Sequence, residues 1–318
     1  MKFVLTHPLN PAAMALLEEK GADVFVANSE DPETFMDELQ TADVFIIRIG
    51  SCRASVIERC PGLKVIGRTG VGFDSVDVAA ATAHQIPVVV TPGANNRSVA
   101  EYVMAAMFAL SRNMLEADAE LRKGNWQIRD AGKSFELEGR KIGIVGVGAI
   151  GRLVASLCQG IGMKTAGYDA LFPQNVVAAG CELYTDLHEM IRDCDVVTVH
   201  SPLTPETVDM FTAKEFAMMK KTAVLINAAR GPIVNIRDLA EALNNGVIAG
   251  AAVDVYDEEP VPMDSPAFTA KNLICTPHIA AMTNEGSVRM SVMCVEGCLA
   301  VCRGEQWPYV VDRNVYGN

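Results

Sequence analysis

Residues 141–151 combine a short apolar run with three closely spaced glycines, and this stretch constrains the fold more than any other part of the chain. The apolar run that precedes the glycines is typical of a buried parallel strand. Gly146, Gly148 and Gly151 follow, and apolar side chains then return at helical spacing over residues 153–161. The sequence therefore predicts a strand, a tight glycine turn and a helix.

The spacing Gly-x-Gly-x-x-Gly is that of a dinucleotide-binding turn. Gly146 permits the tight turn, Gly148 lets the backbone approach a pyrophosphate, and Gly151 lets the helix pack close to the strand. The next apolar segment ends in Asp169, 18 residues after Gly151, near the spacing of about 20 expected for an acid that binds ribose. A carboxylate there accepts hydrogen bonds from both ribose hydroxyls and repels a 2′-phosphate. Since no arginine follows directly, the pattern favours NAD over NADP.

The composition suits two ordinary globular domains. The chain has 318 residues, half of them hydrophobic, which is enough for two sizeable cores. Its formal charge of −12, from 27 basic and 39 acidic residues, is spread along the chain and argues against binding to nucleic acid or to an anionic membrane surface. No apolar run is long enough for the core of a signal sequence or for a membrane span, so we expect a cytoplasmic protein.

Nine cysteines occur without a regular spacing, which favours reduced thiols over a disulfide framework. Cys294, Cys298 and Cys302 share one face of an expected helix. Their spacing does not match the Cys-x-x-Cys pattern of zinc sites, so we interpret them as small buried hydrophobic residues and expect no metal site.

Apolar runs alternate with helix-period segments through most of the chain. The first 90 residues predict a flavodoxin-like parallel sheet covered on both faces, and the part after Asp169 predicts a second doubly wound domain. The polar stretch 112–139 fits either a second amphipathic helix with an arm or a subunit contact. The expected strands are 3–5, 24–26, 44–47, 64–66, 88–90, 195–200, 223–226, 249–253 and 273–275, and the expected helices lie near 10–20, 32–40, 54–60, 75–83, 98–110, 186–193, 236–244 and 285–302.

Three expected strands in the second half are each followed by an ionisable residue: Arg230, Glu259 and His278. Because the carboxyl ends of parallel strands share one edge of a sheet, we expect these side chains to meet at a cleft. A guanidinium binds a carboxylate through two hydrogen bonds, an imidazolium donates a proton as hydride arrives, and a glutamate fixes the tautomer of the histidine. This set suits reduction of a 2-oxo acid. His200 is the alternative acid, but no acidic residue lies at an obvious partnering position, so we expect it to pack on the cofactor side.

Two arginines follow neighbouring strands in the first half. Arg48 comes after the run 44–47, and Arg68 opens the turn Arg68-Thr-Gly70-Val71-Gly72. Two guanidinium groups and the backbone N–H groups of a glycine-rich turn can converge on a carboxylate or a phosphate. We therefore predict that the substrate is bound by Arg48, Arg68, Gly70, Val71 and Gly72, together with Arg230.

Taken in order, these motifs resemble the D-isomer-specific 2-hydroxyacid dehydrogenase family along essentially the whole chain. The motifs are Leu63–Asp74, Thr91-Pro-Gly-Ala-Asn95, Gly146–Gly151, Tyr168-Asp169, His200-Ser-Pro-Leu-Thr204, Asn227-Ala-Ala-Arg230-Gly231, Asp254–Pro260 and Thr276-Pro-His278. The resemblance implies an NAD-dependent oxidoreductase with Arg230, Glu259 and His278 as its catalytic residues. It also implies a larger set of residues around the cofactor: Val71, Gly146, Gly148, Ala149, Ile150, Gly151, Asp169, Ser201, Ala228, Arg230, Asp254 and His278.

The resemblance further implies an α/β architecture of two doubly wound parallel-sheet domains. A Rossmann NAD-binding domain over residues 99–282 would be inserted into a flavodoxin-like substrate-binding domain made of residues 1–98 and 283–318. Hinge closure between such domains would exclude water from the reaction. Homodimers through the cofactor domain are usual in such families.

Within the family, Arg48 and the turn at Arg68 most resemble phosphoglycerate dehydrogenases, in a form without the C-terminal regulatory domain. The loop after Arg48, Ile49-Gly-Ser-Cys52, replaces the usual Ser-x-Thr type of sequence and is one residue shorter. The favoured substrate pair is 3-phosphoglycerate and phosphohydroxypyruvate, and reduction of hydroxypyruvate or glyoxylate is the alternative. The family also includes NAD-binding corepressors, so a non-catalytic NAD-sensing scaffold is the alternative of another class.

Overall fold

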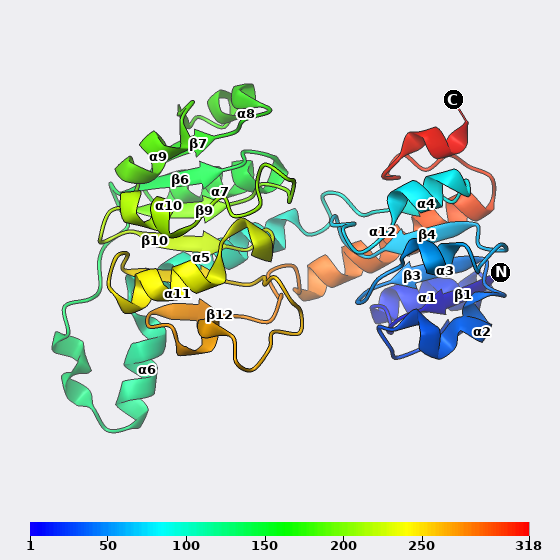
Figure 1. The fold of residues 1–318 in the computed structure, drawn as a ribbon, viewed down its shortest axis with the longest axis horizontal. Coiled ribbons are helices and arrows are strands. Elements are labelled where there is room, and N and C mark those ends of the chain that lie inside the picture. Colours follow the sequence, from blue (N-terminus) through cyan, green and yellow to red (C-terminus); the bar gives the residue numbers. More distant parts are fainter. Residues whose placement is uncertain (318) are drawn as a thin grey trace. The chain divides into compact units, whose positions relative to one another are not determined.

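The computed structural model describes residues 1–317, which form two compact units (Figure 1). Unit 1 contains Met1–Asn95 and the segment from Met282 onward, and unit 2 contains Asn96–Ala281. The boundaries fall at 95/96 and 281/282, against 98/99 and 282/283 expected from the sequence. Within the described residues, the strands form one sheet of five and one of seven, both parallel throughout. The predicted fold class, two doubly wound α/β domains, is confirmed.

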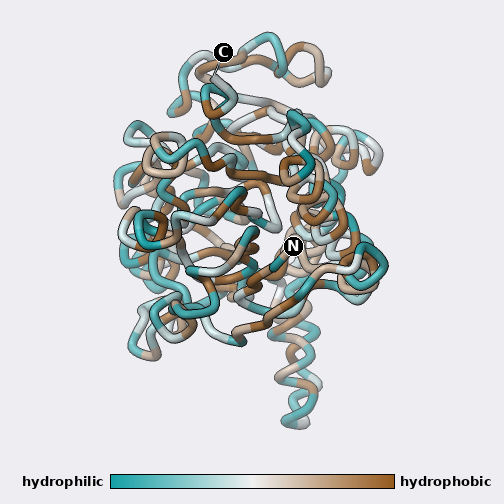
Figure 2. The backbone as a smooth tube through the Cα atoms, turned by 90° about the vertical axis from the view of Figure 1, so that its right-hand side faces the viewer, coloured by the Kyte–Doolittle hydropathy of each residue, from teal (hydrophilic) through white to brown (hydrophobic). Residues whose placement is uncertain are grey.

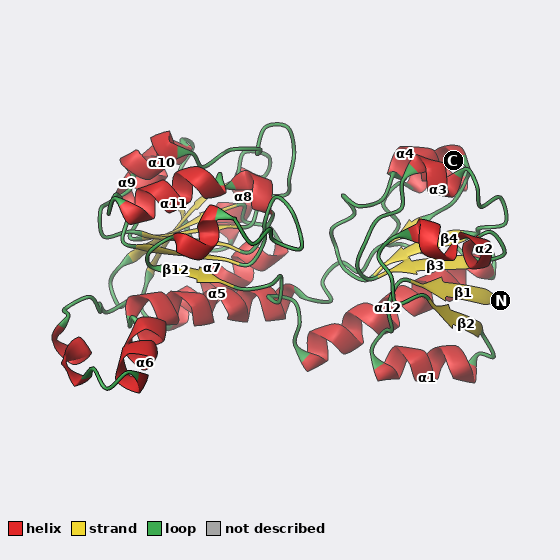
Figure 3. Ribbon diagram, turned by 60° about the horizontal axis from the view of Figure 1, so that its bottom comes forward, coloured by secondary structure: helices red, strands yellow, loops and turns green. Residues whose placement is uncertain are grey.

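Unit 1 has the strand order β2-β1-β3-β4-β5 of flavodoxin-like folds. Its central strands are continuous apolar runs, as expected for a sheet that is buried on both faces. Helices α1 and α12 cover one face, and α2, α3 and α4 cover the other (Figure 3). The elements are β1 (Lys2–Leu5), α1 (Pro11–Glu19), β2 (Asp23–Val26), η1 (Pro32–Phe35), α2 (Met36–Leu39), β3 (Val44–Ile47), α3 (Ala54–Ile57), β4 (Val65–Arg68), α4 (Val78–Ala83), β5 (Val88–Val89), α12 (Asn284–Cys302) and η5 (Arg313–Tyr316).

The cysteine stripe lies on α12. Cys294 and Cys298 are fully buried, and a Cβ atom added at Gly67 of β4 would come within 2.7 Å and 2.8 Å of their sulfur atoms. A residue without a side chain is therefore needed where the helix crosses this strand. Cys294 and Cys298 act as small hydrophobic residues, whereas Cys302 is only partly buried.

Unit 2 has the strand order β12-β11-β10-β9-β6-β7-β8, with apolar clusters on both faces of the sheet. The order reverses at β6, beside the glycine turn, and such switch points are the usual binding sites of open α/β sheets. The elements are α5 (Asn96–Ser111), α6 (Met114–Arg122), η2 (Trp126–Asp130), β6 (Lys141–Val145), α7 (Ala149–Gly160), β7 (Lys164–Tyr168), α8 (Pro173–Ala178), β8 (Glu182–Leu183), α9 (Leu187–Asp193), β9 (Val196–Val199), α10 (Ala213–Met218), β10 (Val224–Asn227), η3 (Gly231–Ile233), α11 (Ile236–Asn244), β11 (Gly250–Val253), η4 (Pro266–Thr269) and β12 (Leu273–Cys275).

The stretch that the sequence left undecided, 112–139, contains helix α6 and the short helix η2. No residue of Met114–Arg122 is buried. We call residues 112–139 the arm. Figure 2 shows its helix as the projecting one in which hydrophilic and hydrophobic residues alternate. None of the helices in the described part of the chain is both long and apolar enough to cross a membrane.

Candidate active site

The glycine turn after β6 is shaped by close backbone contacts. Gly146 has φ +87°, and a Cβ atom there would lie 2.8 Å from the amide nitrogen of Ser201. A Cβ atom at Gly151 would overlap the carbonyl oxygen of Gly146, whereas one at Gly148 would meet nothing within 4 Å. Two glycines therefore allow the turn itself, and the third leaves open space at the start of α7.

Helix α7 begins at Ala149 with its first amides available to a ligand. The N-cap residue is Gly148, which has no side chain with which to cap these amides. The N–H groups of the first helical turn, which include those of Ala149 and Ile150, carry the positive end of the helix dipole. Together with the open space at Gly148, they fit the pyrophosphate of a dinucleotide.

Asp169 follows β7 directly and is held by backbone amides. Its Oδ2 atom accepts a hydrogen bond from the amide of Val147 at 2.9 Å, and its Oδ1 atom accepts from those of Leu171 and Phe172 at 3.2 and 2.8 Å. The carboxylate is thereby fixed beside the glycine turn and stays partly exposed. Oδ1 already accepts two hydrogen bonds, whereas Oδ2 accepts one and keeps a lone pair for a ribose hydroxyl.

The three residues proposed for catalysis lie just beyond three neighbouring strands, β10, β11 and β12. The Nδ1 atom of His278 is 2.7 Å from the Oε2 atom of Glu259. The other oxygen of Glu259 accepts a hydrogen bond from the amide of Tyr256 at 3.1 Å. Because both oxygens are engaged, the carboxylate holds the imidazole ring in one orientation, with Nε2 as the nitrogen opposite this bond.

The positive charge of Arg230 acts on Glu259. Burial raises the pKa of Glu259, but the hydrogen bond and charge of His278, the amide of Tyr256 and the charge of Arg230 together outweigh burial and lower it below its usual 4.5. Glu259 is therefore ionised at neutral pH. A Cβ atom at Gly231 would overlap the backbone of Tyr256, so this glycine lets the segment after β10 lie directly against the loop that carries Glu259.

The segment that carries His278 is tied to Asp254, the first residue after β11. The Asp254 side chain is completely buried, and its oxygens accept hydrogen bonds from the Thr276 hydroxyl at 2.6 Å, the Ile279 amide at 2.8 Å and the Ala280 amide at 2.7 Å. The amide of His278 also donates to the carbonyl oxygen of Asp254 at 2.9 Å, and His278 has φ +53°. Asp254 was expected beside the cofactor. Its carboxylate instead organises the histidine segment, and a direct cofactor contact stays a prediction.

His200, the alternative acid, sits in a different environment. Burial lowers its pKa to about 4, and its Nε2 atom lies 3.0 Å from the hydroxyl of Thr198. A ring that stays neutral at pH 7 has no proton to give as an imidazolium. The backbone of His200 packs against Gly146, so this histidine belongs to the glycine turn.

The predicted substrate residues of unit 1 lie in loops after β3 and β4. An Nη1 N–H of Arg48 donates to the carbonyl oxygen of Pro8 at 3.1 Å, and an Nη1 N–H of Arg68 donates to that of Arg48 at 2.9 Å. The arginines thus tie the loops after β1, β3 and β4 together. In the following turn, the carbonyl oxygen of Gly70 accepts a hydrogen bond from the Thr91 amide.

Several polar residues at this edge of unit 1 were not predicted as site residues, although Thr91 and Asn95 belong to one of the motifs found in the sequence. At this edge, four buried side-chain atoms have no hydrogen-bond partner among the described residues: His7 Nδ1, Ser75 Oγ, Thr91 Oγ1 and Asn95 Oδ1. All four residues follow β1, β4 or β5 at the carboxyl edge of the sheet. Buried polar atoms without partners are costly unless a ligand or water satisfies them. The available signal was position for His7, Thr91 and Asn95, which come soon after expected strands; Ser75 lies at the start of the expected helix 75–83 and gave no such signal.

The other predicted residues also follow strands. Ser201 and Ala228 are partly buried and come after β9 and β10, and Val71 and Gly72 lie in the turn after β4. Val71 is well exposed at 42%.

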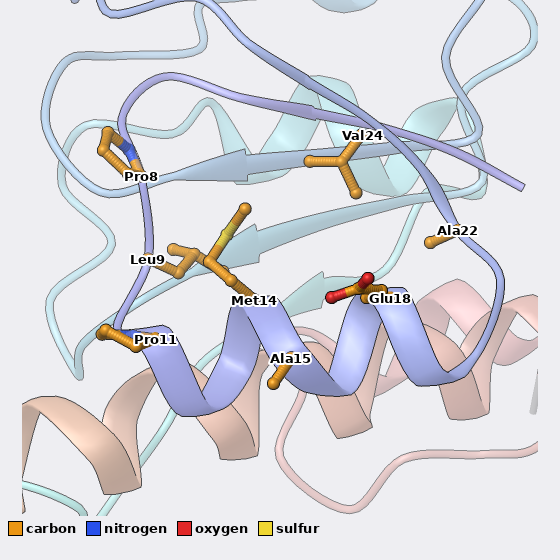
Figure 4. Close-up of a pocket in the computed structure, with 8 residues that line it drawn as sticks. All are labelled: Pro8, Leu9, Pro11, Met14, Ala15, Glu18, Ala22 and Val24. Atoms are coloured by element: carbon orange, nitrogen blue, oxygen red, sulfur yellow. The ribbon is translucent and has the colours of Figure 1, made fainter.

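A separate hollow of about 750 Å³ lies on unit 1 along α1 and β2 (Figure 4). Its walls are mainly apolar, with Leu9 and Met14 among them, and Glu18 is its one ionisable side chain among residues 8–24. A hollow with a carboxylate and no cation does not suit an acidic substrate.

Comparison with known proteins gives one consistent result. The family model for the NAD-binding domain of D-isomer specific 2-hydroxyacid dehydrogenases matches residues 104–280, more than half of the chain. D-3-phosphoglycerate dehydrogenase of Methanocaldococcus jannaschii is 40% identical over 314 residues, which cover 98% of this chain and 59% of that enzyme. Glyoxylate reductase of Thermofilum pendens is 35% identical over 325 residues, covering 99% of this chain and 95% of that enzyme.

Solved structures share the fold over nearly the whole chain. The structure of an NAD-dependent formate dehydrogenase from Staphylococcus aureus in complex with NAD has a TM-score of 0.88 and 30% identity, and the match covers 98% of this chain and 99% of that one. The chain spans about 59% of the length of the phosphoglycerate dehydrogenase that it matches, but nearly the full length of the glyoxylate reductase.

Proposed function

We propose that this chain, which belongs to the D-isomer specific 2-hydroxyacid dehydrogenase family, transfers a hydride between NAD(H) and the C2 atom of a small D-2-hydroxy acid or 2-oxo acid. The 2.7 Å contact between His278 and Glu259, within the charge field of Arg230, carries this proposal. The contact lies at the carboxyl edge of the sheet in the NAD-binding domain, where the glycine turn and Asp169 also lie.

Each residue has a distinct task in the proposed reaction. Arg230 binds the carboxylate of the 2-oxo acid through two hydrogen bonds and polarises the adjacent carbonyl group. NADH supplies the hydride when it is bound. The Nε2 atom of His278 donates a proton to the carbonyl oxygen, while ionised Glu259 stabilises the protonated ring through Nδ1. In the reverse direction, the neutral ring accepts the proton of the 2-hydroxyl group.

The substrate that we favour is the pair 3-phosphoglycerate and phosphohydroxypyruvate. Two cationic side chains, Arg48 and Arg68, and a cluster of buried polar atoms lie at the carboxyl edge of unit 1 and suit a distal anionic group. Phosphoglycerate dehydrogenases are also among the relatives. Hydroxypyruvate or glyoxylate is the alternative, because Ile49 exposes an apolar side chain directly after Arg48, and glyoxylate reductases match nearly end to end.

A steady-state assay with NADH and five 2-oxo acids tests the activity and the substrate together. We expect phosphohydroxypyruvate to give a higher kcat/KM than hydroxypyruvate, glyoxylate, pyruvate or 2-oxoglutarate. Faster reduction of hydroxypyruvate or glyoxylate would select the alternative substrate. NADH binding without reduction of any of these acids would contradict the activity and favour the non-catalytic scaffold.

The arm of unit 2 supports a further proposal, that the protein is a homodimer through its NAD-binding domain. The arm, residues 112–139, exposes large apolar side chains, including Leu115 at 58% and Trp126 at 63%. Clustered apolar surface of this kind is costly in water and marks contact sites. A second copy that presents the same arm would cover both apolar faces at once.

Light scattering after size-exclusion chromatography tests the dimer. We expect a mass of about twice the 34.1 kDa of the chain and a monomer for Leu115→Glu/Trp126→Glu, since buried charges oppose association. Val177→Glu is the matched control, because Val177 is exposed to a similar degree on α8. A wild-type monomer would contradict the proposal, as would a dimer that survives both arm substitutions.

A further inference from the structure

A chain of hydrogen bonds links helix α5 to the segment that carries His278. The hydroxyl of Tyr102, in the second turn of α5, lies 2.6 Å from the hydroxyl of Thr276. The Thr276 hydroxyl is in turn 2.6 Å from the Oδ1 atom of Asp254. Residues 174 positions apart in sequence are therefore joined through two side-chain hydroxyls.

The number of available protons decides which group is the donor and which the acceptor in each of these two hydrogen bonds. Asp254 is a carboxylate that already accepts two backbone N–H groups, and an ionised carboxylate can only accept. The single hydroxyl proton of Thr276 is thus given to Asp254, so Tyr102 must donate to Thr276. Burial raises the pKa of Tyr102 to about 12, which keeps this donor protonated over the range in which the enzyme would work.

Asp254 connects these hydrogen bonds to the segment that carries His278. Its carboxylate holds the amides of the two residues that follow His278, and its carbonyl oxygen accepts from the amide of His278 itself. A histidine with φ +53° needs such support, because residues other than glycine are strained in the left-handed region of the backbone angles. The phenol of Tyr256 adds a hydrogen bond to the carbonyl oxygen of Thr276 at 3.1 Å, while its amide holds Glu259.

We propose that Tyr102 is a positioning residue for the acid–base pair, acting through Thr276 and Asp254 to hold His278 against Glu259. This inference rests on the proposed role of His278 as the proton donor. The two segments that the network joins lie next to the unit boundaries: α5 starts directly after the 95/96 boundary, and the histidine segment ends directly before the 281/282 boundary. The network thus ties together, inside unit 2, the two segments through which the chain passes between the units.

The test compares variants of the full-length protein in the NADH-dependent reduction of the best 2-oxo acid. Tyr102→Phe removes one hydroxyl and should lower kcat about 3- to 10-fold, which corresponds to the net value of one hydrogen bond. Thr276→Val should lower it at least as much, and Thr276→Ser should restore it. Adding Tyr102→Phe to Thr276→Val should cost nothing more, since Tyr102 acts through that hydroxyl. Tyr309→Phe, at an exposed tyrosine of unit 1, is the control and should match the wild type.

The division of the effect between kcat and KM separates positioning from simple support of the fold. Tyr102 acts on the segment that carries the proposed proton donor and not on Arg230, which is proposed to bind the carboxylate of the substrate. Tyr102→Phe should therefore lower kcat and leave the KM for the 2-oxo acid close to that of the wild type. A wild-type kcat in Tyr102→Phe would overturn the inference, even if the melting temperature fell, and so would a higher KM with an unchanged kcat. Equal kcat values for Thr276→Val and Thr276→Ser, or fully additive losses in the double variant, would also overturn it.

His278→Asn separates this inference from the proposed function. If His278→Asn keeps its turnover, the proton donor is misassigned and both fall. If it loses turnover while Tyr102→Phe behaves as wild type, the acid–base role stands and only the positioning role fails.

Discussion

Replacing His278 with Asn is expected to lower kcat for reduction of the 2-oxo acid by about 10³-fold, within the range for loss of a general acid. Asparagine is polar and of similar size, but it cannot carry the proton that the imidazolium gives to the carbonyl oxygen. NADH binding, measured by fluorescence titration, should stay close to wild type. The glycine turn and Asp169, which are proposed to hold the cofactor, lie beyond other strands of the sheet. The loss should therefore fall on kcat rather than on the affinity for NADH.

Unit 2 offers a matched control for this substitution. His188, on α9, also pairs with a glutamate, and its Nε2 atom lies 3.1 Å from the Oε1 atom of Glu215 on α10. His188→Asn removes the same kind of histidine–glutamate contact away from the proposed site, so kcat should stay close to that of the wild type. Equal losses in the two variants would show that His278 matters only for the fold. Undiminished turnover in His278→Asn would remove it from the reaction.

The sequence predicted the parts of the fold that depend on local pattern. The glycine turn, the apolar strands and the long helices are encoded by residues close in sequence, and they lie where the periodicity placed them. The short elements α8, α10 and β8 were missed, because six residues or fewer give too little periodic signal. Helix α3 ends at Ile57 and α4 begins only at Val78, so both are shorter than expected.

The candidate site was predictable to the extent that it follows strand order. Arg230, Glu259 and His278 could be proposed together because the carboxyl ends of parallel strands lie at one edge of the sheet. The sequence did not predict the burial of Asp254, the positive φ of His278 or the contact between Tyr102 and Thr276. These depend on packing between segments far apart in the chain, and a tyrosine in an amphipathic helix gives no sign of its partner.

The buried histidine of the glycine turn leads to a prediction about stability. In the unfolded chain, the imidazole of His200 is in water and takes up a proton near its ordinary pKa of 6.5, whereas in the folded protein burial lowers the pKa to about 4. Between these values the unfolded state binds more protons than the folded state, so acid favours unfolding. The contribution of His200 is thus fully present above pH 6.5 and is lost as pH falls from 6.5 towards 4.

His200→Gln removes this titration and so isolates its effect. When the pH is lowered from 7.5 to 5, the unfolding free energy of the wild type should fall by about 2 kcal/mol more than that of the variant, because only the wild type contains the histidine with the lowered pKa. Urea unfolding of both proteins at the two pH values measures the difference, and the carboxylates common to both cancel. The stability of the variant should change less with pH than that of the wild type. Equal losses in the two proteins would mean that the ring of His200 is protonated in the folded protein as readily as in water, and it would then be a rival to His278 as the acid.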